Sequence, residues 1–123
     1  MSCKYTRNEK DERVWGRWEV LDVADTYIVK RIEVLSGKKL SLQTHKYRDE
    51  NWVIAQGTAC ITLGHEKIVK KEKEHVFIPA GEFHRIENIG ENLLVFIEMQ
   101  SGDVLDEEDI IRYDENYQPV SKS

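Results

Sequence analysis

The chain has 123 residues, the size of one ordinary domain that can bury a core of its own. Its 18 basic and 23 acidic residues give a formal net charge of −5, which argues against nucleic acid or an anionic membrane as a partner. The N-terminus lacks a signal-peptide pattern and no apolar run approaches the length of a membrane span, so we expect a cytoplasmic protein.

The chain opens with a polar stretch, residues 1–12, which we expect to be a flexible leader. Residues 13–117 then form one domain, and residues 118–123 form a tail. Cys3 falls in the leader and Cys60 in an apolar strand pattern. This placement favours two unpaired thiols over a disulfide framework and fits a reducing compartment.

Short strands separated by glycines follow one another at close, fairly even spacing. In residues 27–35, Lys30 shares a face with Ile28 and Ile32, whereas Arg31 and Glu33 take the other face. Further strands are expected at 39–45, 51–56, 58–63, 68–72, 75–80, 83–88 and 92–100. Only the acidic segment 105–113 has a helical pattern. The sequence predicts an all-β fold of two packed sheets closed into a small barrel, whose mouth can hold a ligand.

One set of polar residues has the spacing of a metal site. Strand alternation puts Gln43 and His45 on one face, and a bend after His45 would bring Glu50 close to it. His84 arrives from a separate hairpin. Two imidazoles, a carboxylate and an amide oxygen suit a borderline divalent cation. Each histidine alone could instead be an ordinary hydrogen-bonded residue, but their joint spacing favours a metal.

The same residues carry a resemblance to the cupins. The first cupin motif is matched in spacing by Gly37, Gln43, His45, Glu50 and Gly57, with Gln43 in place of the first histidine. The second is matched by Pro79, Gly81, His84 and Asn88, without its opening glycine. The resemblance implies a double-stranded β-helix and a metal held by Gln43, His45, Glu50 and His84.

Longer segments narrow the resemblance to one branch of the cupins. "WGRWEVLD", "LSLQTHKYRDENWVIAQGTACIT", "FIPAGEFHRIENIG" and "FIEMQSGDVLDEEDIIRYDENY" are similar to the type II phosphomannose isomerases, also found as the C-terminal domain of bifunctional mannose-1-phosphate guanylyltransferases. The chain departs from that family at Val14, at Lys46 and Tyr47, and at the ending Tyr117, Gln118 and Pro119. The resemblance implies a zinc-dependent interconversion of mannose 6-phosphate and fructose 6-phosphate through a cis-enediol, supplying precursors for nucleotide sugars and polysaccharides.

Two residues are candidates for catalysis. Glu98 shares a strand face with Leu94, Phe96 and Gln100, so it would point into the barrel and act as the base at C2. The alternative is a Glu98 that is ion-paired on the outside. Arg48 is implied by the resemblance to act in catalysis or at the sugar phosphate.

The substrate phosphate needs cationic groups near the mouth of the barrel. The candidates for substrate binding are Lys30, Arg85, Arg112 and Trp52. For each cation, a solvated or ion-paired role is the alternative. Trp15, Trp18 and Trp52 could stack on a sugar or belong to the core.

The sequence leaves three functions open. The first is a mannose-6-phosphate isomerase acting as a homodimer on a small sugar phosphate. The second is a cupin that binds a sugar or sugar phosphate without turnover, since the family's terminal arginine is absent. The third is another reaction of a metal cupin, such as oxygenation or epimerisation of a related sugar.

Overall fold

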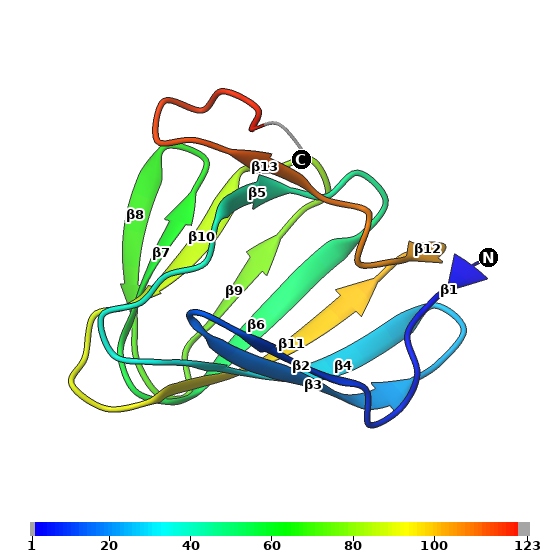
Figure 1. Cartoon of the computed structure of the whole chain (residues 1–123), viewed down its shortest axis with the longest axis horizontal. Coiled ribbons are helices and arrows are strands. Elements are labelled where there is room, and N and C mark those ends of the chain that lie inside the picture. The colour runs from blue at the N-terminus through cyan, green and yellow to red at the C-terminus, as the bar shows by residue number, and fades with distance from the viewer. Residues whose placement is uncertain (1, 121–123) are drawn as a thin grey trace.

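Two antiparallel sheets face each other in the structure, a computed structural model that describes residues 2–120 (Figure 1). In spatial order, the larger sheet contains β2 (Lys10–Arg13), β3 (Gly16–Val23), β4 (Tyr27–Val34), β11 (Leu94–Ser101), β6 (Asp49–Gln56) and β9 (His75–Ile78). The smaller contains β13 (Ile111–Tyr113), β5 (Leu42–Thr44), β10 (His84–Asn88), β7 (Ala59–Leu63) and β8 (Glu66–Lys70). The predicted all-β class is confirmed.

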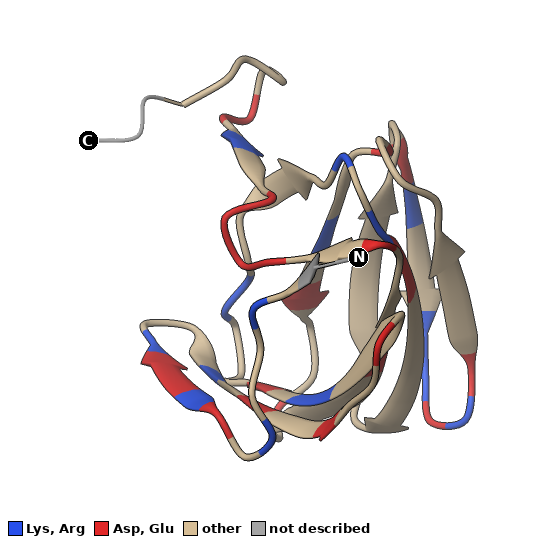
Figure 2. Ribbon diagram, turned by 90° about the vertical axis from the view of Figure 1, so that its right-hand side faces the viewer, with Lys and Arg blue, Asp and Glu red and all other residues tan. Residues whose placement is uncertain are grey.

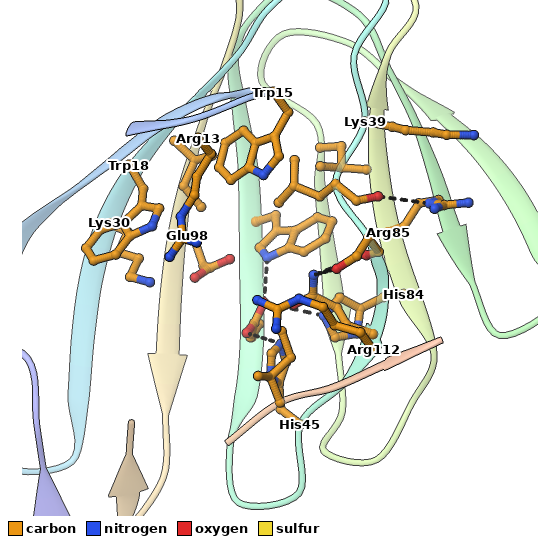
Figure 3. A pocket seen from close by; sticks show the side chains of 18 of the residues that line it. Arg13, Trp15, Trp18, Lys30, Lys39, His45, His84, Arg85, Glu98 and Arg112 are labelled. Atoms are coloured by element: carbon orange, nitrogen blue, oxygen red, sulfur yellow. Dashed lines mark hydrogen bonds and ion pairs between the residues drawn. The ribbon is translucent and has the colours of Figure 1, made fainter. Parts of the chain in front are cut away.

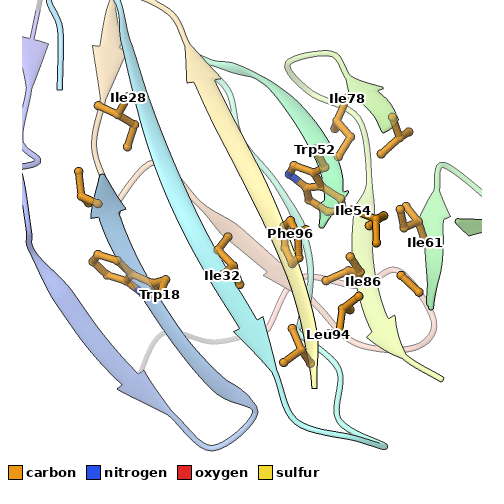
Figure 4. Packing of buried hydrophobic residues seen from close by; sticks show 14 of the residues in the cluster. Trp18, Ile28, Ile32, Trp52, Ile54, Ile61, Ile78, Ile86, Leu94 and Phe96 are labelled. Carbon is orange, nitrogen blue, oxygen red and sulfur yellow. The ribbon is translucent and has the colours of Figure 1, made fainter. Parts of the chain in front are cut away.

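The core lies between the two sheets and follows the alternation of side chains. On β11, Leu94, Phe96, Glu98 and Gln100 all point inward and are buried, as their shared face predicted. Phe96 meets the ring of Trp52 on the neighbouring strand, with ring centroids 5.1 Å apart. Figure 4 shows the apolar side chains of both sheets interleaving. Burying each large apolar side chain contributes roughly 1.5–3 kcal/mol to stability.

The inner face of the larger sheet changes from apolar to polar along its strands. Lys30, Glu98 and Trp52 form one cross-strand row, because Glu98 pairs with Lys30 on one side and Trp52 on the other. Gln100 and Glu50 pair in the next inward-facing row. All five side chains are buried. This end of the barrel therefore needs partners for buried polar groups, and the candidate site forms here.

The prediction of a helix at residues 105–113 is wrong. The segment instead contains β12 (Val104–Leu105), a turn, and β13, which pairs with β5. In the turn, side-chain oxygens accept hydrogen bonds from backbone N–H groups. Asp106 Oδ1, for example, accepts one from the Glu108 N–H at 3.0 Å. Such local bonds compete with helix formation, and pairing with β5 supplies the remaining backbone bonds.

Residues 2–12, expected to belong to a flexible leader, contribute one strand and most of a second. β1 (Ser2–Cys3) pairs in parallel with β12, and β2 forms a hairpin with β3. Between them, Tyr5 is 5% exposed and packs edge-to-face on Trp18. This segment therefore covers one end of the barrel core.

The lysine-rich strand β8 forms an edge of the smaller sheet, where its charges oppose pairing with another chain. Cys3 and Cys60 are both free thiols, as expected. Basic and acidic residues are interspersed along the chain in Figure 2. Within residues 2–120, no helix has the length and apolar character that crossing a bilayer requires.

Candidate metal centre and pocket

Three side chains from separate strands converge where the inner face becomes polar. His45 directly follows β5, Glu50 is the second residue of β6, and His84 begins β10. The ligand-capable atoms of these three residues all lie within 4.8 Å of one another, and all three residues are buried. These three of the four predicted ligands therefore lie close together, and metal binding by them stays a prediction.

The carboxylate of Glu50 lies at the centre of this cluster. Its Oε2 atom is 3.3 Å from His45 Nε2 and accepts a hydrogen bond from Arg48 Nε at 2.9 Å. Its Oε1 atom accepts one from Trp52 Nε1 at 2.9 Å and is 3.9 Å from His84 Nε2. Burial alone would raise the pKa of Glu50, but the Arg48 guanidinium and the two histidines hold it well below its usual range. Glu50 is therefore an anion.

The Nδ1 atom of each histidine, which faces away from Glu50, is hydrogen-bonded to a backbone carbonyl. His45 Nδ1 donates to Asp109 O at 2.6 Å, and His84 Nδ1 donates to Glu82 O at 2.9 Å. These bonds turn both Nε2 atoms toward Glu50 as acceptors. Burial lowers the pKa of His45 to about 4 and also lowers that of His84. Both rings are therefore neutral near pH 7, the form that binds metals.

The donor set fits a divalent cation. Among the residues described, the buried His84 Nε2 has no hydrogen-bond partner, which is costly unless another group binds it. Within residues 2–120, His45 Nε2 contacts Glu50 Oε2 and one hydrogen-bond donor, Arg48 Nη2, at 3.3 Å. Two imidazole nitrogens and a carboxylate suit a borderline metal and leave coordination positions open, as catalytic metal sites do.

The cluster lies in a pocket of about 610 Å³ between the two sheets. In Figure 3, Lys30, Trp18 and Glu98 are on the wall formed by the larger sheet. His84 and Arg112 are on the opposite wall, formed by the smaller sheet. The volume suits a small organic ligand that would touch both walls.

Comparison with known proteins identifies the family. A family profile described as "Mannose-6-phosphate isomerase C-terminal" matches residues 3–115. The chain belongs to this family.

The relatives of this chain include longer proteins. The chain is 41% identical over 112 residues to the xanthan biosynthesis protein XanB of Xanthomonas campestris pv. campestris, covering 91% of this chain and 24% of XanB. It is 41% identical over 105 residues to the mannose-1-phosphate guanylyltransferase ManC of Salmonella typhimurium, covering 85% of this chain and 22% of ManC. The domain therefore spans about a quarter of the length of these relatives.

A solved structure confirms the cupin fold of this chain. The Schizosaccharomyces pombe Cnp3 cupin domain superposes with a TM-score of 0.69 at 18% identity, covering 71% of this chain and 61% of that chain.

In this cupin domain, Gln43 lies beside the candidate ligand cluster. It pairs with His84 across β5 and β10 and lines the pocket. Its Nε2 atom donates to the Ser41 carbonyl and hydroxyl oxygens, both at 3.1 Å. Ligation by Gln43 stays a prediction.

Glu98 is buried and lines the pocket of the cupin domain, as alternation predicted. Gln100 Nε2 donates to Glu98 Oε2 at 2.8 Å. Burial, reinforced by the negative charge of Glu50, raises the pKa of Glu98 to about 8. Its use as a base stays a prediction.

The predicted substrate-binding residues all line the pocket but differ in their partners. Lys30 is 3% exposed, and its Nζ donates to Glu107 Oε2 at 2.7 Å. Arg85 is paired with Glu115, at 2.8 Å. Within residues 2–120, the Arg112 side chain makes no ion pair or hydrogen bond. The fourth, Trp52, is a buried core residue whose indole donates to the cluster carboxylate.

Three residues near the site of the cupin domain were missed by sequence analysis: Tyr5, Glu107 and Asp109. Tyr5 donates a short hydrogen bond to Glu107 and belongs to the supposed leader. Glu107 and Asp109 come from the supposed helix. The position of Tyr5 as a lone aromatic residue in a polar run could have indicated that it is buried. The sequence has no feature that would have indicated a role for Glu107 or Asp109.

Proposed function

We propose that this domain is a metal-dependent aldose–ketose isomerase that interconverts mannose 6-phosphate and fructose 6-phosphate. The proposal depends on one observation: a buried His45–Glu50–His84 cluster shares a pocket with the buried carboxyl group of Glu98. The family to which the chain belongs supports the choice of substrate.

His45, Glu50 and His84 would hold the metal, with Gln43 as a fourth ligand, and zinc is our choice among the divalent ions that this donor set accepts. When bound, the cation supplies a Lewis acid that stabilises negative charge on the substrate oxygens. Trp52 and Arg48 keep the Glu50 carboxylate oriented, through bonds of 2.9 Å to its two oxygens. The chain's own bonds thus preorganise the ligands.

The reaction moves a proton between C1 and C2 of the open-chain sugar through a cis-enediol. Glu98 takes the proton from C2 and returns it to C1, while a hydroxyl proton passes between O1 and O2. The Gln100 amide fixes one oxygen of Glu98 and so orients the carboxyl group. Arg48 lines the pocket beside Glu50, and we assign it to stabilise negative charge on the reacting oxygens.

The phosphate is assigned to the cations of the smaller-sheet wall. Arg112 has a guanidinium without an ion-pair partner among residues 2–120, and Arg85 lies on a neighbouring part of the same sheet. A guanidinium can bind a phosphate through two parallel hydrogen bonds. Lys30 and Trp52 would contact the sugar from the opposite wall.

The test combines metal analysis with a coupled enzyme assay that measures the fructose 6-phosphate formed from mannose 6-phosphate. His84→Ala should lose both zinc and activity, because it removes one of the two imidazoles. His75→Ala, which changes an exposed histidine on β9, is the matched control and should change neither. Glu98→Gln should keep zinc and lower kcat by about 10²–10⁴-fold, the usual contribution of a general base.

Two results would contradict the proposal. A wild-type domain that stays empty at saturating zinc would remove its basis. A domain that binds zinc and mannose 6-phosphate without turnover would instead be a sugar-phosphate-binding cupin, the alternative left open by the sequence.

A further inference from the structure

The segment Asp106–Asp109, between β12 and β13, contacts the site at several points and is called the acidic loop here. The Asp106 carbonyl accepts a hydrogen bond from Arg48 Nη1 at 3.1 Å. Glu107 pairs with Lys30, as described above. Asp109 makes the largest number of these contacts, and all of them involve the residues at and after His45.

Asp109 forms three hydrogen bonds with three consecutive residues. Its carbonyl accepts from His45 Nδ1 at 2.6 Å. Its carboxylate oxygens accept from the Lys46 and Tyr47 backbone N–H groups, each at 2.9 Å. The side chain therefore ties the acidic loop to the chain directly after His45, while the main chain contacts the ring itself. Bonds from N–H groups to a carboxylate are stronger than those between neutral groups.

We propose that Asp109 is a positioning residue for the metal site, acting through His45; this inference rests on the proposed function. The carboxylate holds the Asp109 carbonyl against Nδ1, which keeps the proton on Nδ1 and leaves the Nε2 lone pair facing Glu50. Without the carboxylate, the acidic loop loses both bonds to the backbone after His45. The ring then loses the constraint on its tautomer and orientation.

Asp106 provides a matched control from the same loop. Its carboxylate accepts a hydrogen bond from the Glu108 N–H at 3.0 Å, inside the acidic loop. Among the residues described, it makes no side-chain bond to residues 45–47. Asp106→Ala and Asp109→Ala therefore remove the same charge from the same segment, but only Asp109→Ala removes the bonds to the residues after His45.

The first measurement is the zinc dissociation constant, by competition with a chromophoric chelator, for the full chain and its Asp109→Ala, Asp109→Asn and Asp106→Ala variants. Asp109→Ala should bind zinc about 10–100-fold more weakly, the usual effect of losing such an outer partner. Asp109→Asn keeps one acceptor oxygen, so its zinc affinity should lie between that of Asp109→Ala and that of wild type. Asp106→Ala should bind zinc like wild type.

The second measurement needs no metal. Long-range ¹H–¹⁵N correlation of the histidine rings in the metal-free protein reports the tautomer of each ring. His45 should carry its proton on Nδ1 in wild type and in Asp106→Ala, and should populate both tautomers in Asp109→Ala. His84 contacts the Glu82 carbonyl and should be unchanged in all variants.

The outcomes separate the two proposals. A wild-type chain that binds no zinc overturns the proposed function, and the tautomer measurement then decides the role of Asp109. A folded Asp109→Ala variant with wild-type zinc affinity and a wild-type His45 tautomer overturns the positioning role. If Asp109→Ala does not fold, the same two readouts on Asp109→Asn decide, and wild-type behaviour there overturns the inference as well.

Discussion

Lys30 shows how this barrel accommodates a charge in its interior. The ammonium group is 4.1 Å from the centroid of the Trp18 ring and 4.6 Å from that of Tyr5. Glu107 then supplies the counter-charge. A buried charge is costly unless it is paired and hydrogen-bonded, so these three partners are what keep Lys30 inside the barrel.

Glu107→Gln should destabilise the fold by about 1 kcal/mol near pH 7, because Lys30 loses its counter-charge while water screens part of the pair at the 39% exposed Glu107 side chain. Burial would raise the pKa of Glu107, but Lys30 lowers it from 4.5 to about 2. Its contribution is therefore present above about pH 4.5 and is lost as the pH falls toward 2. Urea unfolding of both proteins at several pH values should show their difference narrowing in acid. A constant difference would mean that Glu107 stabilises by shape alone.

The orientation of a single side chain could be predicted from the sequence where it depends only on the residue's position along its own strand. Strand alternation put Lys30 and Glu98 on the same faces as apolar residues, and both are buried, because the period of two holds along any regular strand. Asp109 and Glu107 escaped prediction, because their roles depend on how an irregular segment lies against another part of the chain. The identity of their partners is a tertiary fact that spacing does not carry.

The β3–β4 hairpin depends on a close backbone approach at Gly16. Gly16 pairs with Val34 and has a φ of +152°. A Cβ atom built there would lie 1.9 Å from the Glu33 carbonyl oxygen, so no side chain fits without moving the strand. Because Trp18 and Lys30 lie on these two strands, this approach also sets the position of one pocket wall.

Gly16→Ala should destabilise the domain by at least about 2 kcal/mol, since the clash is with backbone and the φ is unfavourable for alanine. Gly90→Ala is the matched control. A Cβ atom built at Gly90 would have its nearest contact with Asn88 Oδ1 at 3.6 Å, which is an ordinary van der Waals distance, and the φ of Gly90 is not in the left-handed region. Thermal and urea unfolding compare the two variants. Equal stability of both would contradict the argument.

The elements themselves could be predicted where strands are regular and flanked by turn residues. The acidic segment could not, because residues 105–113 lack both the alternation of a strand and a glycine or proline that would break a helix. Pairing of β13 with β5 and the side-chain bonds of the aspartates outweighed that local preference.

At the scale of the whole molecule, the candidate ligands join parts of the chain that are far apart. Glu50 belongs to the larger sheet, whereas His84 belongs to the smaller one. Folding must therefore bring the two sheets together before the three ligands meet. A cation that binds this cluster binds the folded state and not the unfolded chain, so its affinity adds to stability.

Zinc at about 100 times its dissociation constant should raise the free energy of unfolding by about 2.7 kcal/mol. For a domain of this size, the melting temperature should rise by about 10 °C. Calorimetry with zinc, with a chelator, and with the His84→Ala variant measures this. The variant should show no such rise, and an equal rise in the variant would locate the zinc elsewhere.

The pocket lining also has consequences for how a charged ligand arrives. It carries six cationic side chains, Arg13, Lys30, Lys39, Arg48, Arg85 and Arg112, against three acidic ones, Glu50, Glu98 and Glu107. The molecule as a whole has a net charge of −5. A phosphate dianion is thus opposed by the net charge of the molecule and attracted by the pocket, and both effects act mainly within roughly one screening length, about 8–10 Å at moderate ionic strength. Added salt weakens the repulsion and the attraction together, so encounter rates with this domain should be less sensitive to salt than those of a basic protein.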